Sequence, residues 1–204
     1  VWVIPAEDCD ESGRADACEV VLPGADGNVD GVLDRCMCAG DLDFDSLRLP
    51  EPVRDLANVA RGLVLVTGAT GSGKSTTLAA MVGHINRARA AHIVTIEDPI
   101  EFVHADQKSR ISQREIGADT ESFSDALRHV VRQSPDVIVI GEMRDAETVA
   151  VALSAALTGH LVLASLHTID ATQTLQRMLS YYPDHLRGQV AMDLSLSLRG
   201  DRKS

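Results

Sequence analysis

The chain has 204 residues, a formal net charge of −11 and an aromatic content of only 3%. This length is enough for one compact domain with a full core, and the acidic balance excludes a general nucleic-acid binder. With so few aromatic side chains the core has to be aliphatic, which is typical of a parallel sheet covered by helices on both faces.

The first 43 residues differ in composition from the rest of the chain. Residues 1–45 hold 12 of the 30 acidic residues but only 2 of the 19 basic ones. They also hold all four cysteines, Cys9, Cys18, Cys36 and Cys38. Their spacing is unlike a zinc knuckle, and a disulfide is disfavoured in a cytosolic protein. We interpret residues 1–43 as an acidic leader, unassigned and either disordered or non-native, and 44–204 as the folded domain.

A phosphate-binding motif follows a short predicted strand. Residues 63–67, LVLVT, form an apolar run between two glycines, which is typical of a buried strand. The next residues, GATGSGKS at 68–75, match the pattern G-x-x-x-x-G-K-[ST]. Apolar residues at helical spacing then predict a helix over 76–90. Strand, glycine loop and helix in this order are the context that a P-loop requires.

Each residue type in this loop suits a nucleoside triphosphate with magnesium. Glycines let backbone N–H groups approach phosphate oxygens, and the helix N-terminus adds the positive end of its dipole. Lys74 supplies a cation for the β- and γ-phosphates, and the Ser75 hydroxyl is a ligand for Mg²⁺. The predicted nucleotide-binding residues are Gly68, Ala69, Thr70, Gly71, Ser72, Gly73, Lys74, Ser75 and Thr76.

Acidic residues follow a second predicted strand, residues 93–96. In an open parallel sheet, ligands bind at the carboxyl ends of the strands. Glu97, Asp98 and Glu101 come directly after this strand. Three carboxylates beside a triphosphate repel it unless a cation or a proton intervenes, so a role with Mg²⁺ or water is indicated. The alternative is a solvated acidic turn.

A third predicted strand, VIVI, lies between Asp136 and Glu142. Asp136 precedes the strand and therefore belongs to the wrong edge of the sheet. Glu142 follows it and is the natural Walker B acid, which would hold Mg²⁺ through water. Arg144 is two residues further on and could reach the same crevice. A salt bridge from Arg144 to Asp145 or Glu147 on the next helix is an equal alternative.

The remaining residues predict alternating helices and strands. The nearly apolar run 149–166 is interrupted at Gly159, which favours two short elements over one membrane-spanning helix. The predicted elements are a helix over 148–159, a strand over 161–166, a helix over 171–182 and a last helix after Pro183. In that last helix Leu186, Val190, Leu194 and Leu198 recur every four residues, which favours a core-facing stripe.

Two histidines, His160 and His167, flank the predicted strand 161–166. Seven residues at ~3.3 Å each separate them by roughly 23 Å, so they can neither share a metal nor form a catalytic pair in one subunit. His167 lies at the nucleotide end of the strand and can act as a γ-phosphate sensor or donor. His160 lies at the opposite edge, where a packing role is an equal alternative.

Four motifs together resemble a known family. GATGSGKSTTLAAM, TIEDPIEF, PDVIVIGEMRD and TGHLVLASLHT occur in the same order as in secretion ATPases of the type II and type IV pilus class. The resemblance covers roughly residues 44–199. SQREIG and DTESFSDALR resemble the retraction branch, the PilT/PilU-type twitching-motility ATPases. Assembly and export ATPases usually carry a four-cysteine zinc insertion, and this chain has no cysteine after Cys38.

The resemblance implies a fold and a set of site residues. The fold is a RecA-like P-loop NTPase core, an α/β structure with a mostly parallel sheet and helices on both faces. Glu101 would be the general base that polarises the attacking water. Glu142 would be the Walker B acid, which together with Ser75 holds Mg²⁺. His160 and His167 would form the family's histidine box.

The resemblance also implies an assembly and a location. Members work as homohexameric rings that hydrolyse ATP at the cytoplasmic base of the pilus, beside an inner-membrane platform protein, without nucleic acid. Two departures matter: residues 1–43 do not resemble the family's N-terminal domain, and the chain stops at 200–204, where members continue with more helices. The alternatives are a pilus assembly or type II secretion ATPase, and a nucleotide-binding accessory subunit with little turnover.

Overall fold

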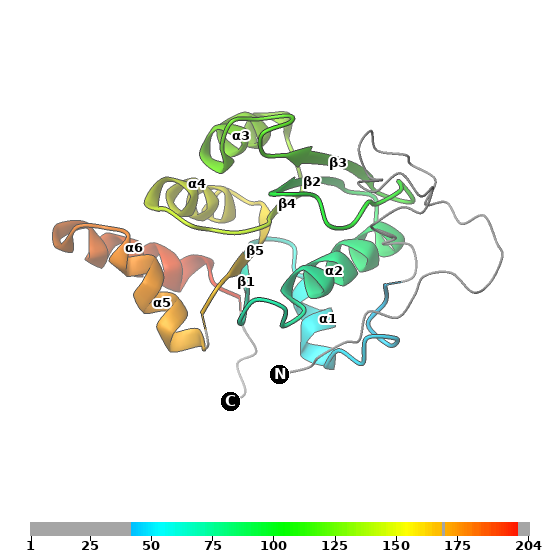
Figure 1. Ribbon diagram of the computed structural model, residues 1–204, viewed down its shortest axis with the longest axis horizontal. Helices are drawn as coiled ribbons and strands as arrows, with labels where there is room; N and C mark the ends of the chain where they lie inside the picture. Colours follow the sequence, from blue (N-terminus) through cyan, green and yellow to red (C-terminus); the bar gives the residue numbers. More distant parts are fainter. Residues whose placement is uncertain (1–41, 169, 200–204) are drawn as a thin grey trace, which may run out of the picture.

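The computed structural model describes residues 42–168 and 170–199 of the chain (Figure 1). Its strands are β1 (Gly62–Thr67), β2 (His92–Glu97), β3 (Arg110–Glu115), β4 (Val137–Ile140) and β5 (Leu161–Leu166). Its helices are α1 (Glu51–Asn58), α2 (Lys74–Ala88), α3 (Phe123–Val130), the 3₁₀-helix η1 (Val131–Gln133), α4 (Ala146–Leu157), α5 (Ala171–Ser180) and α6 (Asp184–Ser197). The predicted acidic leader falls on residues outside this described part, apart from 42 and 43.

The strands form one sheet in the order β1-β5-β4-β2-β3, and every neighbouring pair is parallel. Thr67 at the end of β1 pairs with Leu166 at the end of β5, and Ile96 of β2 pairs with Ile140 of β4. Because all strands run the same way, the segments that follow β1, β2, β4 and β5 meet at one edge of the sheet. That edge carries the candidate site.

Helices cover both faces of the sheet, as the aliphatic composition predicts (Figure 1). On one face α2 buries Met81 and Ile85, and α1 buries Ala57, in one cluster with strand residues such as Leu163. On the other face α3, α4 and α6 bury Leu127 and Leu153 against residues such as Ile138. The central strands are apolar on both sides because both sides are covered. The predicted RecA-like α/β fold is therefore confirmed.

Helix boundaries follow local capping signals. The helix α2 begins at Lys74, two residues earlier than predicted, after Gly73 in a left-handed conformation with φ 87°. The helix α4 begins after Asp145, whose side chain accepts a hydrogen bond from the Thr148 N–H. It ends just before Gly159, where φ is 115°, so the predicted stop is confirmed.

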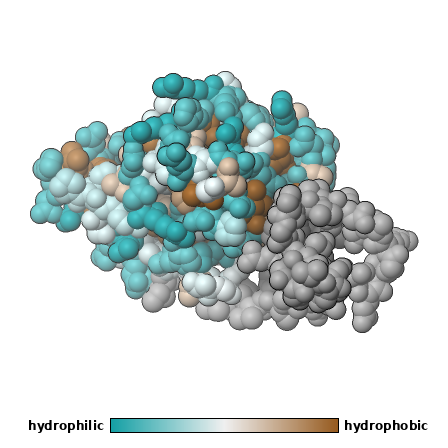
Figure 2. Space-filling model, turned by 45° about the horizontal axis from the view of Figure 1, so that its top comes forward, coloured by the Kyte–Doolittle hydropathy of each residue, from teal (hydrophilic) through white to brown (hydrophobic). Residues whose placement is uncertain are grey.

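The predicted apolar stripe of the last helix is only partly buried. Val190 and Leu194 pack in the core, whereas the side chain of Leu186 is 39% exposed. The described surface in Figure 2 is mainly hydrophilic, with small hydrophobic groups scattered over it. None of the helices among the described residues is both long enough and apolar enough to span a bilayer. The run 149–166 is divided between α4 and β5, as predicted.

Candidate active site

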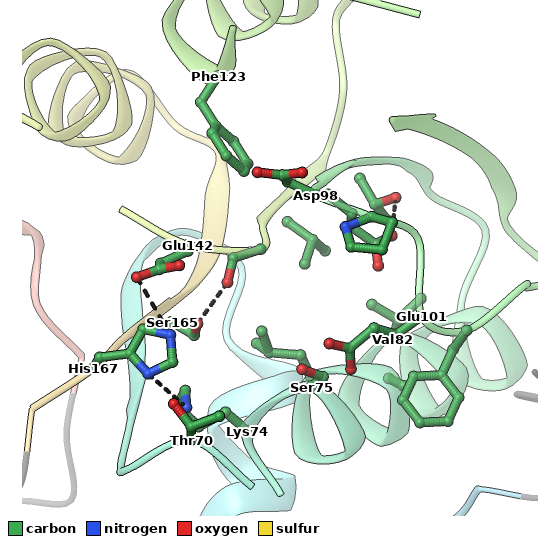
Figure 3. A pocket seen from close by; sticks show the side chains of 18 of the residues that line it. Thr70, Lys74, Ser75, Val82, Asp98, Glu101, Phe123, Glu142, Ser165 and His167 are labelled. Atoms are coloured by element: carbon green, nitrogen blue, oxygen red, sulfur yellow. Dashed lines mark hydrogen bonds and ion pairs between the residues drawn. The ribbon is translucent and has the colours of Figure 1, made fainter. Parts of the chain in front are cut away.

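A cavity of about 280 Å³ opens at the carboxyl edge of the sheet (Figure 3). Its walls come from the glycine loop, the first turns of α2 and the segments that follow β2, β4 and β5. Charged and polar side chains gather in it, among them Lys74, Ser75, Glu97, Asp98, Glu101, Glu142, Arg144 and His167. The parallel topology thus brings together residues that are up to 93 positions apart in the sequence.

The glycine loop has the backbone that the motif predicts. Gly71 and Gly73 adopt φ 75° and 87°, a left-handed conformation in which an L side chain is strained. Gly73 caps α2 without a side-chain hydrogen bond, so the first N–H groups of the helix stay available for an anion. Of the predicted nucleotide-binding residues, Thr70, Gly71, Lys74 and Ser75 line the cavity, whereas Gly68, Ala69, Ser72, Gly73 and Thr76 are not among its lining residues.

The side chain of Lys74 is buried, with 8% of its surface exposed. Its ammonium group lies 2.9 Å from the Ala69 carbonyl oxygen and 3.3 Å from His167 Nδ1. Neither partner carries a negative charge, so the buried cation is not neutralised by them. The Ser72 hydroxyl is also buried without a hydrogen-bond partner. A buried cation and an unpaired hydroxyl at a helix N-terminus fit the phosphates of a nucleotide.

Four charged or titratable side chains form a chain of contacts across the ends of three strands, and Figure 3 shows the part of it between Glu142 and His167. Glu142 lies 2.6 Å from Arg144 Nε and 3.3 Å from His167 Nε2. The other end of Arg144 lies 3.4 Å from a carboxylate oxygen of Asp98. Glu142 is therefore held at the site from both sides, and its role as the Walker B acid stays a prediction.

The predicted alternative for Arg144, a salt bridge to the following helix, is wrong. Asp145 instead caps α4 by accepting hydrogen bonds from Thr148, and Glu147 pairs with Arg128 of α3. The side chain of Arg144 turns back to the site because its two carboxylate partners lie there.

The structure separates the two histidines, as the strand length predicts. His167 follows β5 and lies between Lys74 and Glu142 in the cavity. His160 precedes β5 at the opposite edge, where its Nδ1 lies 2.9 Å from the Ala155 carbonyl oxygen at the end of α4. This contact favours the packing alternative for His160, while the γ-phosphate role of His167 remains a prediction.

Glu101 and Ser75 both point into the cavity (Figure 3). Glu101 belongs to the segment that leaves β2, and it is an exposed residue that lines the cavity. Ser75 lies in the first turn of α2, beside Lys74. A general base at Glu101 and magnesium ligands at Ser75 and Glu142 are thus placed around one space. Their catalytic roles remain predictions.

Sequence reasoning missed the environment of Glu97. Burial raises the pKa of this carboxyl group, while hydrogen bonds from Thr95 and Gln113 act in the opposite direction. Thr95 Oγ1 donates at 2.6 Å and Gln113 Nε2 at 3.2 Å to the same carboxylate oxygen. Gln113 lies on β3, a polar strand with no apolar periodicity, so only the β2–β3 pairing reveals this contact.

His104, which also lines the cavity, gives a pH-dependent prediction. Burial, and secondarily the charge of Arg87, lowers the pKa of His104 from 6.5 to about 4. The unfolded chain therefore binds this proton first, and stability is lost as the pH falls from 6.5 toward 4, by up to about 3 kcal/mol. We expect His104→Gln to flatten this part of the stability curve in urea titrations at several pH values. The matched change His129→Gln, at an exposed histidine of α3, should leave the stability curve unchanged. If the His104→Gln variant loses stability with falling pH as steeply as the wild type does, this explanation is contradicted.

The parallel sheet, the loop between β1 and α2, and the acids after β2 and β4 define a RecA-like P-loop nucleotide-binding domain. Residues 42–193 match the family model described as Type II/IV secretion system protein, so the chain belongs to this family.

Within this family, the chain is similar to several individual proteins of known name. The chain is 52% identical over 156 residues to the type IV pilus ATPase PilU of Pseudomonas aeruginosa, covering 76% of this chain and 41% of that protein. It is 48% identical over 169 residues to the type IV pilus retraction ATPase PilT of the same organism, covering 83% and 49%. The crystal structure of the pilus retraction motor PilT with bound ADP matches with a TM-score of 0.78 and 51% identity, covering 81% and 48%. The chain spans about half the length of these relatives.

Proposed function

We propose that this chain is the ATP-hydrolysing core of a hexameric motor that powers retraction of type IV pili. The observation that carries the proposal is the buried Lys74 ammonium at the N-terminus of α2, which has no negatively charged partner and shares the cavity with the acids that follow β2 and β4. The resemblance to retraction ATPases over most of the chain supports the same reading.

Each residue of the site has its own role in the proposed hydrolysis of ATP. The N–H groups of the glycine loop and Lys74 bind and orient the phosphates of ATP. Ser75 and Glu142 would hold Mg²⁺, which when bound neutralises charge on the phosphate oxygens. Glu101 accepts a proton from the attacking water. His167, beside Lys74, responds to the γ-phosphate.

The assembly and its setting follow from the same resemblance. We expect a homohexameric ring, located in the cytoplasm at the inner-membrane base of the pilus and docked on the platform protein of the machine. His160 would act only indirectly, through the contact between β5 and α4. A type II secretion ATPase is the alternative, and the chain is also 46% identical over 146 residues to the secretion protein HxcR of Pseudomonas aeruginosa.

Complementation separates these functions. The protein should restore twitching motility in a strain that lacks its retraction ATPase, and it should not restore pilus assembly in a strain that lacks the assembly ATPase. The opposite pattern would assign it to assembly. Restoration only when a second retraction ATPase is also produced would identify an accessory subunit.

A further inference from the structure

We infer that Gln113 and Glu115 of β3 are positioning residues that fix the orientation of Glu101. The inference rests on the proposed function, because it takes Glu101 as the general base. Neither residue touches the space where the nucleotide would bind. Both act on the backbone of the segment that carries Glu101, between the end of β2 and the start of β3.

Gln113 holds this segment on the far side of Glu101. Its side-chain oxygen accepts a hydrogen bond from the His104 N–H at 2.8 Å. Its side-chain nitrogen donates to the Phe102 carbonyl oxygen at 2.8 Å. The same nitrogen also donates to a carboxylate oxygen of Glu97 at 3.2 Å, so both the oxygen and the nitrogen of the side-chain amide form hydrogen bonds. If the Gln113 amide were rotated by 180°, its oxygen would face the Phe102 carbonyl oxygen and no hydrogen bond could form there. These contacts therefore fix the orientation of the side chain.

Glu115 holds the segment on the near side of Glu101. One of its carboxylate oxygens accepts a hydrogen bond from the Ile100 N–H at 3.0 Å. Residues two apart on a strand point to the same face, so Gln113 and Glu115 reach the segment together. The backbone is thus tied at positions 100 and 102, immediately before and after Glu101.

The anchor is rigid because β3 is fully paired with β2. Thr95 is in register with Gln113, and Glu97 is in register with Glu115. The more distant part of the loop is held separately by Asn86 of α2, which accepts hydrogen bonds from the N–H groups of residues 107 and 109 and donates one to the carbonyl of residue 105. Loss of the Gln113 contacts should therefore loosen the part that carries Glu101 and leave the rest of the loop in place.

Exposed carboxylates on a mobile segment are poor general bases, because a misplacement of about 1 Å can lower turnover on the order of 100-fold. The two β3 side chains remove that mobility without occupying the cavity. Their effect should therefore appear in kcat and not in nucleotide affinity, which depends on the loop around Lys74.

The test compares four variants of the purified protein in Mg²⁺-dependent ATP hydrolysis. Gln113→Leu and Glu115→Ala should each lower kcat at least 10-fold, with KM and ATP affinity within 3-fold of wild type. Glu115→Gln keeps an oxygen acceptor for the Ile100 N–H and should retain kcat within 3-fold. Asn86→Ala removes three loop hydrogen bonds away from Glu101 and serves as the matched control for lost stability. It should lower the melting temperature while reducing kcat less than 3-fold.

Two further readouts distinguish positioning from folding. Amide exchange at residue 104, whose N–H Gln113 accepts, should accelerate in Gln113→Leu, and adding Gln113→Leu to Glu101→Gln should cause no further loss of turnover. The inference is overturned if Gln113→Leu and Glu115→Ala keep kcat within 2-fold, or if Asn86→Ala loses as much turnover as they do. If the wild-type protein does not hydrolyse ATP, the proposed function fails, and the exchange measurement alone still decides whether Gln113 holds the segment.

Discussion

Replacing Lys74 with alanine should raise the dissociation constants for ATP and ADP at least 100-fold. The Lys74 ammonium is buried at the N-terminus of α2, and its present partners are a carbonyl oxygen and an imidazole nitrogen. A charge-assisted contact to phosphate of about 3 kcal/mol corresponds to a change on the order of 100-fold in affinity. Isothermal titration with Mg²⁺ present measures this directly.

The same substitution should not unfold the protein. Removing a buried cation that has no negative partner removes its desolvation cost, so the melting temperature without nucleotide should stay the same or rise. Lys108→Ala, at an exposed lysine outside the cavity, is the matched control and should bind as wild type does. Unchanged affinity in the Lys74 variant would place the phosphates elsewhere.

Replacing Glu101 with glutamine should preserve ATP binding and lower turnover by roughly 10²–10³-fold. Glutamine has the same shape but cannot accept a proton, and general bases contribute factors of about 10²–10⁴. Affinity should stay within a few-fold because the phosphates are bound at the other wall of the cavity, by the glycine loop and Lys74. Phosphate release under saturating ATP measures the effect.

Glu121→Gln provides the control, because it makes the same chemical change at an exposed position before α3. It should retain wild-type turnover. If Glu101→Gln also retains it, Glu101 is not the base. The nearby carboxylates Glu97 and Asp98 would then be the next candidates, since both line the same cavity.

Strands with strong apolar runs could be predicted from the sequence. VIVI and LVLASL are buried throughout and LVLVT is buried in its first half, and the glycine pattern predicts the phosphate loop after LVLVT. The parallel topology then places Glu142 and His167 at the nucleotide edge, and Asp136 and His160 at the other. This part of the site follows from strand direction alone.

The strand β3 could not be predicted in this way. Its sequence, RISQRE, has no alternation of apolar and polar residues. The strand lies at the edge of the sheet and, in the described part of the chain, pairs only with β2. Its polar side chains are used for the segment around Glu101 and not for the core. A pattern that reports burial does not detect a strand whose side chains serve the site.

The short helices α1 and α3 were not predicted from the sequence, and the sequence left two alternatives open for Arg144, of which the crevice of the site is confirmed and the salt bridge to the next helix is wrong. Each helix has only eight residues, which gives two turns of periodicity. The contacts of Arg144 with Glu142 and Asp98 depend on β4 lying beside β2, which local sequence does not encode. The partners of Arg144 are therefore determined by the pairing of strands that are distant in the sequence, and not by the residue types near Arg144.

A crystal structure of the protein with ADP and Mg²⁺ tests the central claim most directly. We predict that the diphosphate lies on the N–H groups of the glycine loop, with Ser75 next to the magnesium ion. The Lys74 ammonium should have left the Ala69 carbonyl oxygen, now 2.9 Å away, and should bind a phosphate oxygen. A nucleotide bound elsewhere, or one that leaves Lys74 on the Ala69 carbonyl, would contradict this claim.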